Sequence, residues 1–335
     1  MTKPRLTLLV NPTSGRGKAG RLLSWIVHRL KKGLPGVDIL TYRTTSFADA
    51  LARGHAAVAA AQHRLERGDV SPDKPDIIAV VGGDGMSHIG FNICAETGLP
   101  LGIIPAGTGN DFLRGLHIKP DLNQAIDAII SGSVRTIDLI EATGDNLING
   151  VTPNPCHKAF VGSAISTGFD ARVNRRANQM PISLGRLSYG YAILGELRSF
   201  RPDSYRVIVN GEKVEREAMI CVVANAGVIG GGMKMCPSAD VTDGKMDITM
   251  IDPVPVTTLL RHLPSLYTGD FVNLPFVHQM SATRVVIDGD GLYGMADGEE
   301  LGPVPITATI KPGQLRLYAP SPNPTTSDCR CRLQR

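Results

Sequence analysis

The sequence has no hydrophobic run that approaches the roughly 20 apolar residues of a membrane-spanning helix. It also has no recognisable secretory leader, because the apolar stretch from Leu6 to Val10 is too short and runs directly into a glycine-rich loop. These absences predict a cytoplasmic protein whose contact with a membrane is at most peripheral.

Patterns that bind zinc or nucleic acid are missing as well. The six cysteines form no CxxC pair with zinc-like spacing and the eight histidines form no HExxH arrangement, so free thiols are expected. Basic residues are scattered without interleaved aromatic side chains, which argues against a nucleic-acid partner. The formal charge of +4 is a mild excess that favours anionic partners such as phosphates or acidic membranes.

The length of 335 residues and a change in the sequence pattern near Val134 predict two domains. Before about Val134, apolar strands alternate with helical patterns, which predicts a parallel sheet with its ligand site beyond the carboxyl ends of the strands. After Val134, short β-type runs dominate and Asn210-Gly211 marks a hairpin, which predicts a β-sandwich. The expected strands of the first part are Leu6 to Val10, Val37 to Thr41, Ile77 to Val81 and Leu101 to Ile104. Helices are expected after the capping residue Ser46, from Asp121 to Ile130, around Leu187 to Phe200 and near Val256 to Tyr267, and Ala159 to Ser166 is one of the later β-type runs.

Three glycine-rich turns each follow a strand of this expected parallel sheet. Glycine lets a backbone approach phosphate closely, and amide groups at helix starts attract anions, so three such turns at one sheet edge predict a site for nucleotide phosphates. The alternative is that they are only tight strand-to-helix turns. None matches GxxxxGK[ST] or a dinucleotide GxGxxG in its usual context, so ATP is favoured over a dinucleotide. The turns are Asn11-Pro12-Thr13-Ser14-Gly15-Arg16-Gly17-Lys18, Gly82-Gly83-Asp84-Gly85 and Pro105-Ala106-Gly107-Thr108-Gly109-Asn110-Asp111.

These turns and later motifs resemble the bacterial diacylglycerol kinase family, which is related to sphingosine and ceramide kinases. The matching segments occur in family order and are NPTSGRGK, GGDGM, PAGTGNDF, STGFDA, NAGVIGGGMKMCPSADVTDGKMD and ADGEELG. The resemblance implies a Rossmann-like parallel α/β domain of the phosphofructokinase and NAD kinase type, joined to a β-sandwich. We expect the nucleotide-binding domain to comprise residues 1–134 and 313–335, with a flexible tail after residue 320, and the lipid-binding sandwich to comprise residues 135–312.

The resemblance also implies roles for individual residues. Glu299 is expected to accept the proton of the substrate hydroxyl, with Asp297 beside it, and Asp84 and Asp111 are expected to join Asp297 around a catalytic magnesium ion. Four acids cannot lie close together without a cation, although Asp297 and Glu299 could instead be surface-loop acids. The ATP-binding positions are Asn11, Pro12, Thr13, Ser14, Gly15, Thr44 (or Thr45 beside it), Gly83, Asp84, Gly85, Met86, Ser87, Ile89, Thr108, Gly109 and Asn110.

A structural magnesium is implied at a second place. Asp243 is expected to bind it, helped by oxygens, expected to be main-chain, from Asp240 and Lys245, although Asp243-Gly244 could equally be a simple hairpin turn.

Two segments depart from the family or add to it. Met86 stands where the family has threonine, and His88 after Ser87 is also unusual and is expected on a helix surface. The segment from Ala171 to Arg201 mixes arginines with apolar residues, which suits either an anionic membrane surface or a helix packed on the sandwich.

The function that the resemblance implies is transfer of the γ-phosphoryl group of ATP to a lipid hydroxyl, first of all diacylglycerol to phosphatidic acid. Expected partners are ATP, Mg²⁺ and a lipid at the membrane surface, and a homodimer is compatible with the sequence. The alternatives are a kinase for a sphingoid base, ceramide or monoacylglycerol, an NAD kinase, and a family member that binds ligands without turnover.

Overall fold

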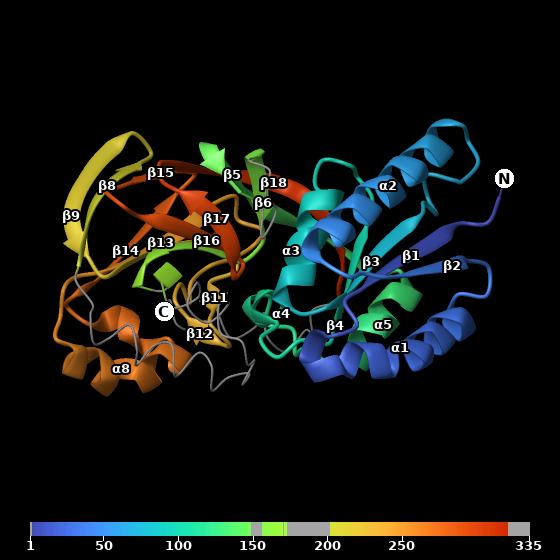
Figure 1. Cartoon of the computed structure of the whole chain (residues 1–335), viewed down its shortest axis with the longest axis horizontal. Helices are drawn as coiled ribbons and strands as arrows, with labels where there is room; N and C mark the ends of the chain where they lie inside the picture. Colours follow the sequence, from blue (N-terminus) through green and yellow to red (C-terminus); the bar gives the residue numbers. More distant parts are fainter. Residues whose placement is uncertain (1, 149–155, 170, 173–201, 321–335) are drawn as a thin grey trace, which may run out of the picture.

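The computed structural model describes residues 2–148, 156–169, 171–172 and 202–320. The chain forms an elongated molecule of two lobes, with the N-terminal α/β lobe on the right of Figure 1 and the β-rich lobe on the left. The expected helix around Leu187 to Phe200, most of the basic segment from Ala171 to Arg201 and the tail after Pro320 lie outside the described residues.

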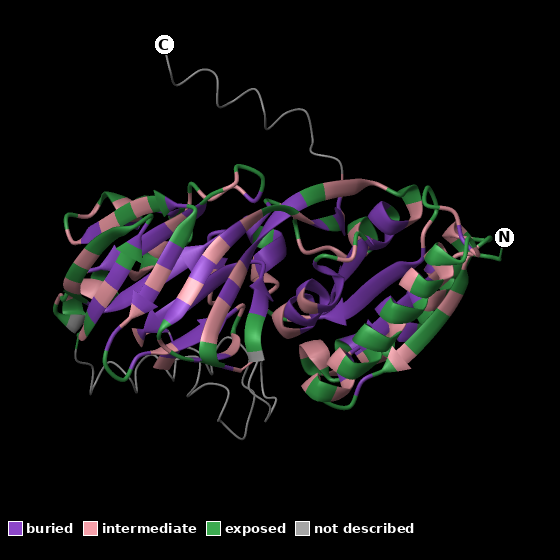
Figure 2. Cartoon of the chain, turned by 90° about the horizontal axis from the view of Figure 1, so that it is seen from above, coloured by how far each residue is buried: buried purple, intermediate pink, exposed green. Residues whose placement is uncertain are grey.

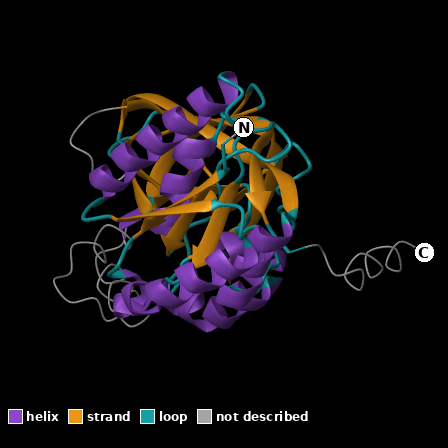
Figure 3. Cartoon of the chain, turned by 90° about the vertical axis from the view of Figure 1, so that its right-hand side faces the viewer, coloured by secondary structure: helices purple, strands orange, loops and turns teal. Residues whose placement is uncertain are grey.

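The N-terminal lobe is a parallel sheet in the order β2-β1-β3-β4, covered by helices on both faces. Figure 1 shows α2 and α3 over one face and α1 and α5 over the other, and Figure 3 shows these helices from the end of the lobe. The elements are β1 (Arg5–Val10), α1 (Ser14–Gly33), β2 (Asp38–Arg43), α2 (Phe47–Glu66), β3 (Ile77–Gly82), α3 (Asp84–Cys94), β4 (Leu101–Pro105), α4 (Asp111–Gly115) and α5 (Leu122–Ser131).

The sequence explains why these elements form where they do. Every residue of β3 is buried because both faces of the sheet are covered, and this matches its unbroken apolar sequence. The hydroxyl of Ser46 accepts a hydrogen bond from the Asp49 amide at 3.0 Å and starts α2. The carboxylate of Asp121 caps α5 in the same way, and Gly132 ends that helix in the left-handed conformation.

The C-terminal lobe is a sandwich of two sheets whose inner faces form one apolar core. One sheet has the order β14-β13-β10-β7-β16-β17, and the other continues from the N-terminal lobe through β18-β15-β8-β9, with β5 and β6 beside β18. Their bounds are β5 (Val134–Leu147), β6 (Cys156–Val161), β7 (Ala164–Gly168), β8 (Asp203–Val209), β9 (Glu212–Ala218), β10 (Ile220–Ala224), β13 (Met246–Ile251), β14 (Val277–Ala282), β15 (Arg284–Asp288), β16 (Tyr293–Ala296), β17 (Glu299–Pro303) and β18 (Ile306–Tyr318).

The long strand β18 joins the two lobes. Its end pairs in parallel with β4 at Leu317 and Tyr318, whereas its beginning pairs with β15 in the sandwich. The chain therefore returns to the N-terminal sheet after building the second lobe, and Figure 2 shows buried strands continuing from one lobe into the other. The exact domain limits stay a prediction.

One expected strand is in fact two. The run from Ala159 to Ser166 is interrupted at Gly162 and Ser163, where the chain leaves β6 in one sheet and enters β7 in the other. An apolar run gives no sign of such a change of sheet, because both halves are buried. The interruption places the amides of Gly162 and Ser163 next to the cleft between the lobes.

Three further elements lie on the outer face of the sheet with the order β14-β13-β10-β7-β16-β17. They are the hairpin β11 (Val228–Ile229) and β12 (Met233–Lys234), the helix α8 (Val256–Thr268) and the short 3-10 helix η1 (Asp270–Asn273). The expected helix from Val256 to Tyr267 corresponds to α8. Within the described ranges, no helix combines the length and the apolar character that crossing a membrane requires.

Candidate active site between the two lobes

The three glycine-rich turns meet at the carboxyl ends of β1, β3 and β4. The Asn11 amide donates to the Val81 carbonyl at 3.1 Å, and the Ala106 and Gly107 amides donate to the Gly82 carbonyl at 2.7 and 3.0 Å. A β-carbon on Gly107 would collide with the backbone of Gly83, so this close approach of the two turns requires glycine. The structure thus brings together the segments that the sequence had placed at one sheet edge.

The first turn has an unusual backbone. Gly15, Arg16 and Gly17 have φ of 60°, 57° and 81°, so three consecutive residues are left-handed before the regular helix begins. A β-carbon on Gly15 would clash with the Ala106 carbonyl oxygen. Glycine is therefore required at position 15 both by its backbone angle and by the close approach of the third turn.

A cavity of about 320 Å³ opens beside these turns. The predicted nucleotide-binding residues Asn11, Thr13, Ser14, Thr44, Gly83, Gly85, Met86 and Ile89 line it, together with Thr45, Ser46, Phe47 and Glu299. Pro12, Gly15, Asp84, Ser87, Thr108, Gly109 and Asn110 belong to the same turns but are not among the lining residues. Glu299 comes from the second lobe, so the cavity is formed by both lobes.

One ATP-binding position is expected at Thr44 or at Thr45, and both residues line this cavity. Thr44 is buried, and its hydroxyl donates to the Val10 carbonyl at 3.1 Å. Thr45 instead donates its amide to the Asp49 carboxylate at 3.0 Å, so its contacts lie toward α2. The two residues therefore differ in their partners: Thr44 is bonded to β1 and Thr45 to α2.

The N-terminus of α3 lies at the cavity. Gly83 is its N-cap residue and supplies no side-chain cap, and Gly83 and Gly85 both line the cavity. The first amides of an α-helix lack partners within the helix, and the helix dipole makes this end partly positive. The cavity is thus suited to an anionic group such as a phosphate.

Asp84 and Asp111 form a buried acidic pair next to this helix start. The two carboxylate oxygens of Asp84 accept hydrogen bonds from the amides of Asn110 at 2.8 Å and Asp111 at 2.6 Å. The carboxylate of Asp111 accepts the Gly231 amide at 2.7 Å. Burial, and then the negative charge of Asp111, raise the pKa of Asp84 to about 7.

Asp297 is a hydrogen-bonding centre between the lobes and not an exposed loop acid. It is almost completely buried, has a left-handed φ of 51°, and accepts the amides of Gly162 at 3.1 Å and Ser163 at 2.6 Å. It also contacts Nδ1 of His88 at 2.8 Å. Since His88 belongs to α3 of the first lobe, this contact joins the two lobes at the site.

The expectation that His88 lies on a helix surface was wrong, because its side chain is only 1% exposed. Phe160 fixes the Asn92 amide: Asn92 Oδ1 accepts the Phe160 amide at 2.8 Å and Nδ2 donates to the Phe160 carbonyl at 2.9 Å. That Nδ2 group also faces Nε2 of His88 at 3.3 Å. Nε2 is therefore the acceptor, and Nδ1 carries the proton that is donated to Asp297.

Reasoning from the sequence missed this role for His88 and Asn92. Their spacing of four residues places them on one face of a helix, which is a usable signal. Nothing local, however, indicates that this face is covered by a strand of the other domain, and that cover is what buries His88.

Glu299 lies directly over the start of α3. A β-carbon on Gly85 would collide with its Oε1 atom, so the carboxylate touches the second glycine-rich turn. Burial raises the pKa of Glu299 above its ordinary value, and the nearby carboxylate of Asp297 adds to this shift. A carboxylate with a raised pKa is a stronger base than one in water.

These acids differ in how well they would fit a cation. Asp84 and Asp111 repel each other, and each oxygen of Asp84 accepts one amide, so an ion beside them would relieve the repulsion and still find lone pairs. Asp297 already receives three hydrogen bonds, two of them on Oδ2. The pair Asp84 and Asp111 therefore fits magnesium, and Asp297 fits a positioning role better.

The second expected magnesium site is a tight turn held by its own hydrogen bonds. Asp240 accepts the Thr242 amide at 3.1 Å, and Asp243 accepts the Lys245 amide at 2.9 Å. Gly244 donates to the buried Asp138 at 2.8 Å, which fastens the turn to β5. Within the described residues, no three of the side chains His, Cys, Asp or Glu gather as metal ligands. The site at Asp240, Asp243 and Lys245 stays a prediction that needs main-chain oxygens.

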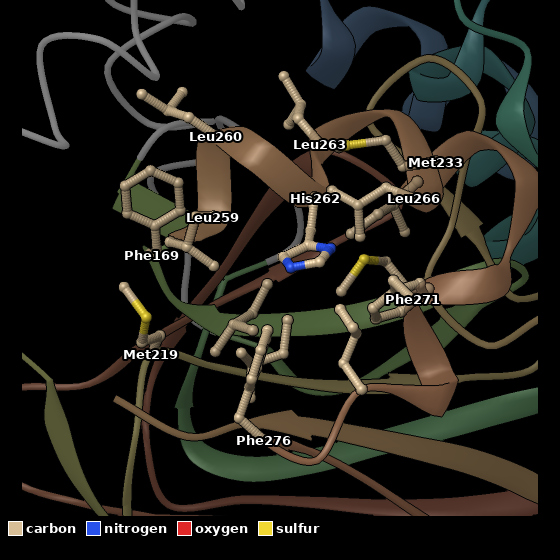
Figure 4. Close-up of a pocket in the computed structure, with 15 residues that line it drawn as sticks. Phe169, Met219, Met233, Leu259, Leu260, His262, Leu263, Leu266, Phe271 and Phe276 are labelled. Atoms are coloured by element: carbon tan, nitrogen blue, oxygen red, sulfur yellow. The ribbon is translucent and has the colours of Figure 1, made fainter. Parts of the chain in front are cut away.

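An apolar cavity lies under α8 in the second lobe (Figure 4). Its volume is about 100 Å³, and His262 is its one residue with an ionisable side chain. The labelled side chains converge from α8 and from the sheet below it. The lining residues are Phe169, Met219, Ile220, Ile229, Met233, Met235, Ile251, Leu259, Leu260, His262, Leu263, Leu266, Phe271, Leu274 and Phe276.

The hairpin of β11 and β12 connects this apolar cavity to the acidic pair. Ile229 and Met233 line the cavity, and Gly231 between them donates its amide to Asp111. The hairpin thus contacts both the apolar cavity and the acidic pair.

Comparison with known proteins identifies the class of enzyme. The family described as "Diacylglycerol kinase catalytic domain" matches residues 5–142, and the family described as "YegS C-terminal NAD kinase beta sandwich-like domain" matches residues 163–319. Together with the fold and the acid-lined cleft between the lobes, these matches define a lipid kinase.

Individual relatives agree over nearly the full length. A diacylglycerol kinase of Mycobacterium tuberculosis H37Rv is 35% identical over 319 residues, which cover 94% of this chain and 95% of that protein. The diacylglycerol kinase of Bacillus subtilis strain 168 is 28% identical over 305 residues, which cover 90% of this chain and 91% of that protein. The chain therefore belongs to the diacylglycerol kinase family.

A solved structure supports the shared fold. The crystal structure of a diacylglycerol kinase from Bacillus anthracis Sterne aligns with a TM-score of 0.66 at 20% identity and covers 97% of this chain and 99% of that one. The expected architecture, a parallel α/β domain followed by a β-sandwich, is confirmed.

Proposed function

We propose that this lipid kinase uses ATP and Mg²⁺ to phosphorylate the free hydroxyl of diacylglycerol, giving phosphatidic acid. One observation carries the proposal: Glu299 of the second lobe lies against Gly85, at the helix start that the three glycine-rich turns surround. A base and a phosphate-binding helix start thereby share one cavity.

The residues have separate tasks in this proposal. The turn from Gly83 and the left-handed turn at Gly15 hold the phosphates of ATP through backbone groups, while Thr44 and Thr45 line the far side of the cavity. Glu299 accepts the proton of the lipid hydroxyl as the new oxygen–phosphorus bond forms and the bond from the γ-phosphorus to the bridging oxygen breaks, which releases ADP. Its buried surroundings favour this, because they keep the carboxylate basic.

Asp84 and Asp111 would hold the magnesium ion. When bound, the ion neutralises the charge that develops on the transferred phosphoryl group. Asp297 does not touch the reacting atoms in this scheme. With its three hydrogen bonds it positions the turn that carries Glu299.

The apolar cavity under α8 is where we place an acyl chain of the lipid. Its lining is suited to hydrocarbon, and the hairpin at Gly231 leads from it to Asp111. Diacylglycerol is the first choice because the relatives carry that name. A sphingoid base, ceramide or monoacylglycerol also has a hydroxyl and a chain that fit this arrangement. The family assignment favours all of these lipids over the NAD substrate considered from the sequence.

The experiment is a transfer assay with γ-labelled ATP, Mg²⁺ and vesicles that each contain one candidate lipid alcohol. We expect labelled phosphatidic acid from diacylglycerol and a loss of at least about a hundredfold in the rate for Glu299→Gln. Glu300→Gln, next in sequence, is the matched control, because the Glu300 carboxylate accepts a hydrogen bond from the Tyr293 hydroxyl and does not line the cavity. Labelling of another lipid only would replace the acceptor, and ATP binding without any lipid product would refute turnover.

A further inference from the structure

The helix α8 exposes large apolar side chains to the solvent in addition to those that it turns toward the protein. Leu259, His262 and Leu266 point to the cavity below. Leu260, which also lines the cavity, and Tyr267 are 43% and 48% exposed. With Pro264 between them, these residues recur at helical spacing and form one outward stripe.

This stripe is unusual within the described part of the chain. Five large apolar side chains are exposed there: Trp25, Leu40, Ile208, Leu260 and Tyr267. The first three lie on three different elements, α1, β2 and β8, whereas the last two share one stripe of α8. Large apolar side chains that gather on an exposed face of a soluble protein mark a surface that contacts another molecule or a membrane.

The charged residues of α8 indicate which kind of surface the outward stripe contacts. Its 13 residues include one basic residue, Arg261, which is exposed next to Leu260, and no acidic residue. Apolar side chains beside an isolated cation are typical of helices that lie in the headgroup region of a bilayer. A water-exposed helix of a soluble surface would instead carry charges of both signs on this side.

We propose that the outward stripe of α8, formed by Leu260, Arg261, Pro264 and Tyr267, is the surface with which the enzyme docks on an anionic membrane. The docking places the roof of the acyl-chain cavity at the leaflet that contains the lipid, so a chain passes from the leaflet beside Leu260 into the cavity. The docking surface follows from α8 itself, whereas its use for substrate delivery depends on the function proposed above.

The test uses the full-length protein and vesicles of phosphatidylcholine with phosphatidylglycerol. We expect Leu260→Asp and Tyr267→Asp each to weaken co-sedimentation with these vesicles by about tenfold or more, because an apolar contact is replaced by a charge of the wrong sign. Ile208→Asp is the matched control. Ile208 is 39% exposed and faces Lys213 across the β8–β9 pair, so an aspartate there has a cationic neighbour.

A second measurement separates docking from catalysis. With a short-chain diacylglycerol that is dissolved in water, Tyr267→Asp should keep the wild-type rate, and on vesicles it should lose activity in parallel with binding. Wild-type protein that binds vesicles through α8 but phosphorylates no lipid would refute the proposed reaction and leave the docking surface in place.

Two results would overturn the docking surface. One is unchanged vesicle binding in the α8 variants. The other is a dimer, seen by sedimentation velocity in the wild type, that dissociates in Leu260→Asp while vesicle binding persists, because the stripe would then contact a second copy of the chain.

Discussion

Replacement of Asp111 by asparagine should stabilise the protein while it abolishes activity. The buried Asp84 has a pKa raised from 3.8 to about 7, first by burial and then by the charge of Asp111. This shift corresponds to a destabilisation on the order of 4 kcal/mol when Asp84 is ionised. Since burial is the larger cause, we assign on the order of 1–2 kcal/mol to Asp111.

Asparagine at position 111 removes the negative charge that repels Asp84. Its amide oxygen can still accept the Gly231 amide, and the backbone bond to Asp84 is unchanged. In the absence of magnesium at pH 8, we therefore expect a gain of about 1–2 kcal/mol in the free energy of unfolding, or a few degrees in Tm. Turnover should fall by orders of magnitude because a magnesium ligand is lost.

The stabilising effect of Asp111→Asn should depend on pH. A carboxyl whose pKa is raised on folding holds its proton more tightly in the folded state, so wild-type stability falls as the pH rises from about 4 through about 7. The gain of Asp111→Asn should thus be present at pH 8 and vanish near pH 4. Magnesium should also diminish it, because the ion relieves the same repulsion.

Urea unfolding at pH 4 and pH 8, with and without magnesium, measures these differences. Asp73→Asn, at an exposed position, is the control and should change nothing. A variant that is equally or less stable than the wild type at pH 8, or a gain that does not depend on pH, would refute the account of Asp84 and Asp111 as a repelling pair.

Three further predictions concern the cleft and the second metal site. His88→Leu should lower kcat about a hundredfold at unchanged KM for ATP, and His88→Asn, whose Nδ2 can still donate to Asp297, should restore part of it; equal loss in both would contradict a positioning role. Gly85→Ala should displace Glu299 and lower kcat, whereas Gly36→Ala, with open space around it, should not. Asp243→Ala should lower Tm and remove any stabilisation by magnesium at that turn; a Tm unchanged with and without magnesium would exclude the structural ion.

Much of the first lobe could be predicted because its signals are local. The strand from Ile77 to Val81 is continuously apolar since both faces are covered, and Ser46 and Asp121 cap helices that begin where expected. The meeting of the three turns also follows from chain direction alone, because parallel strands end at the same edge.

What could not be predicted depends on contacts between distant segments. The break between β6 and β7 is invisible because both strands are buried, and it creates the amides that hold Asp297. Likewise, His88 is buried only because the second lobe covers α3. The sequence indicates Asp297 as an acid of the site, and only the folded chain shows that its oxygens also join the lobes.

The central claim is that three turns distant in sequence form one phosphate site. Hydrogen exchange of the amides with a non-hydrolysable ATP analogue and magnesium tests it most directly. The account predicts simultaneous protection of residues 11–17, 82–87 and 106–110. Protection of only one of these segments, or of amides elsewhere in the chain alone, would contradict it.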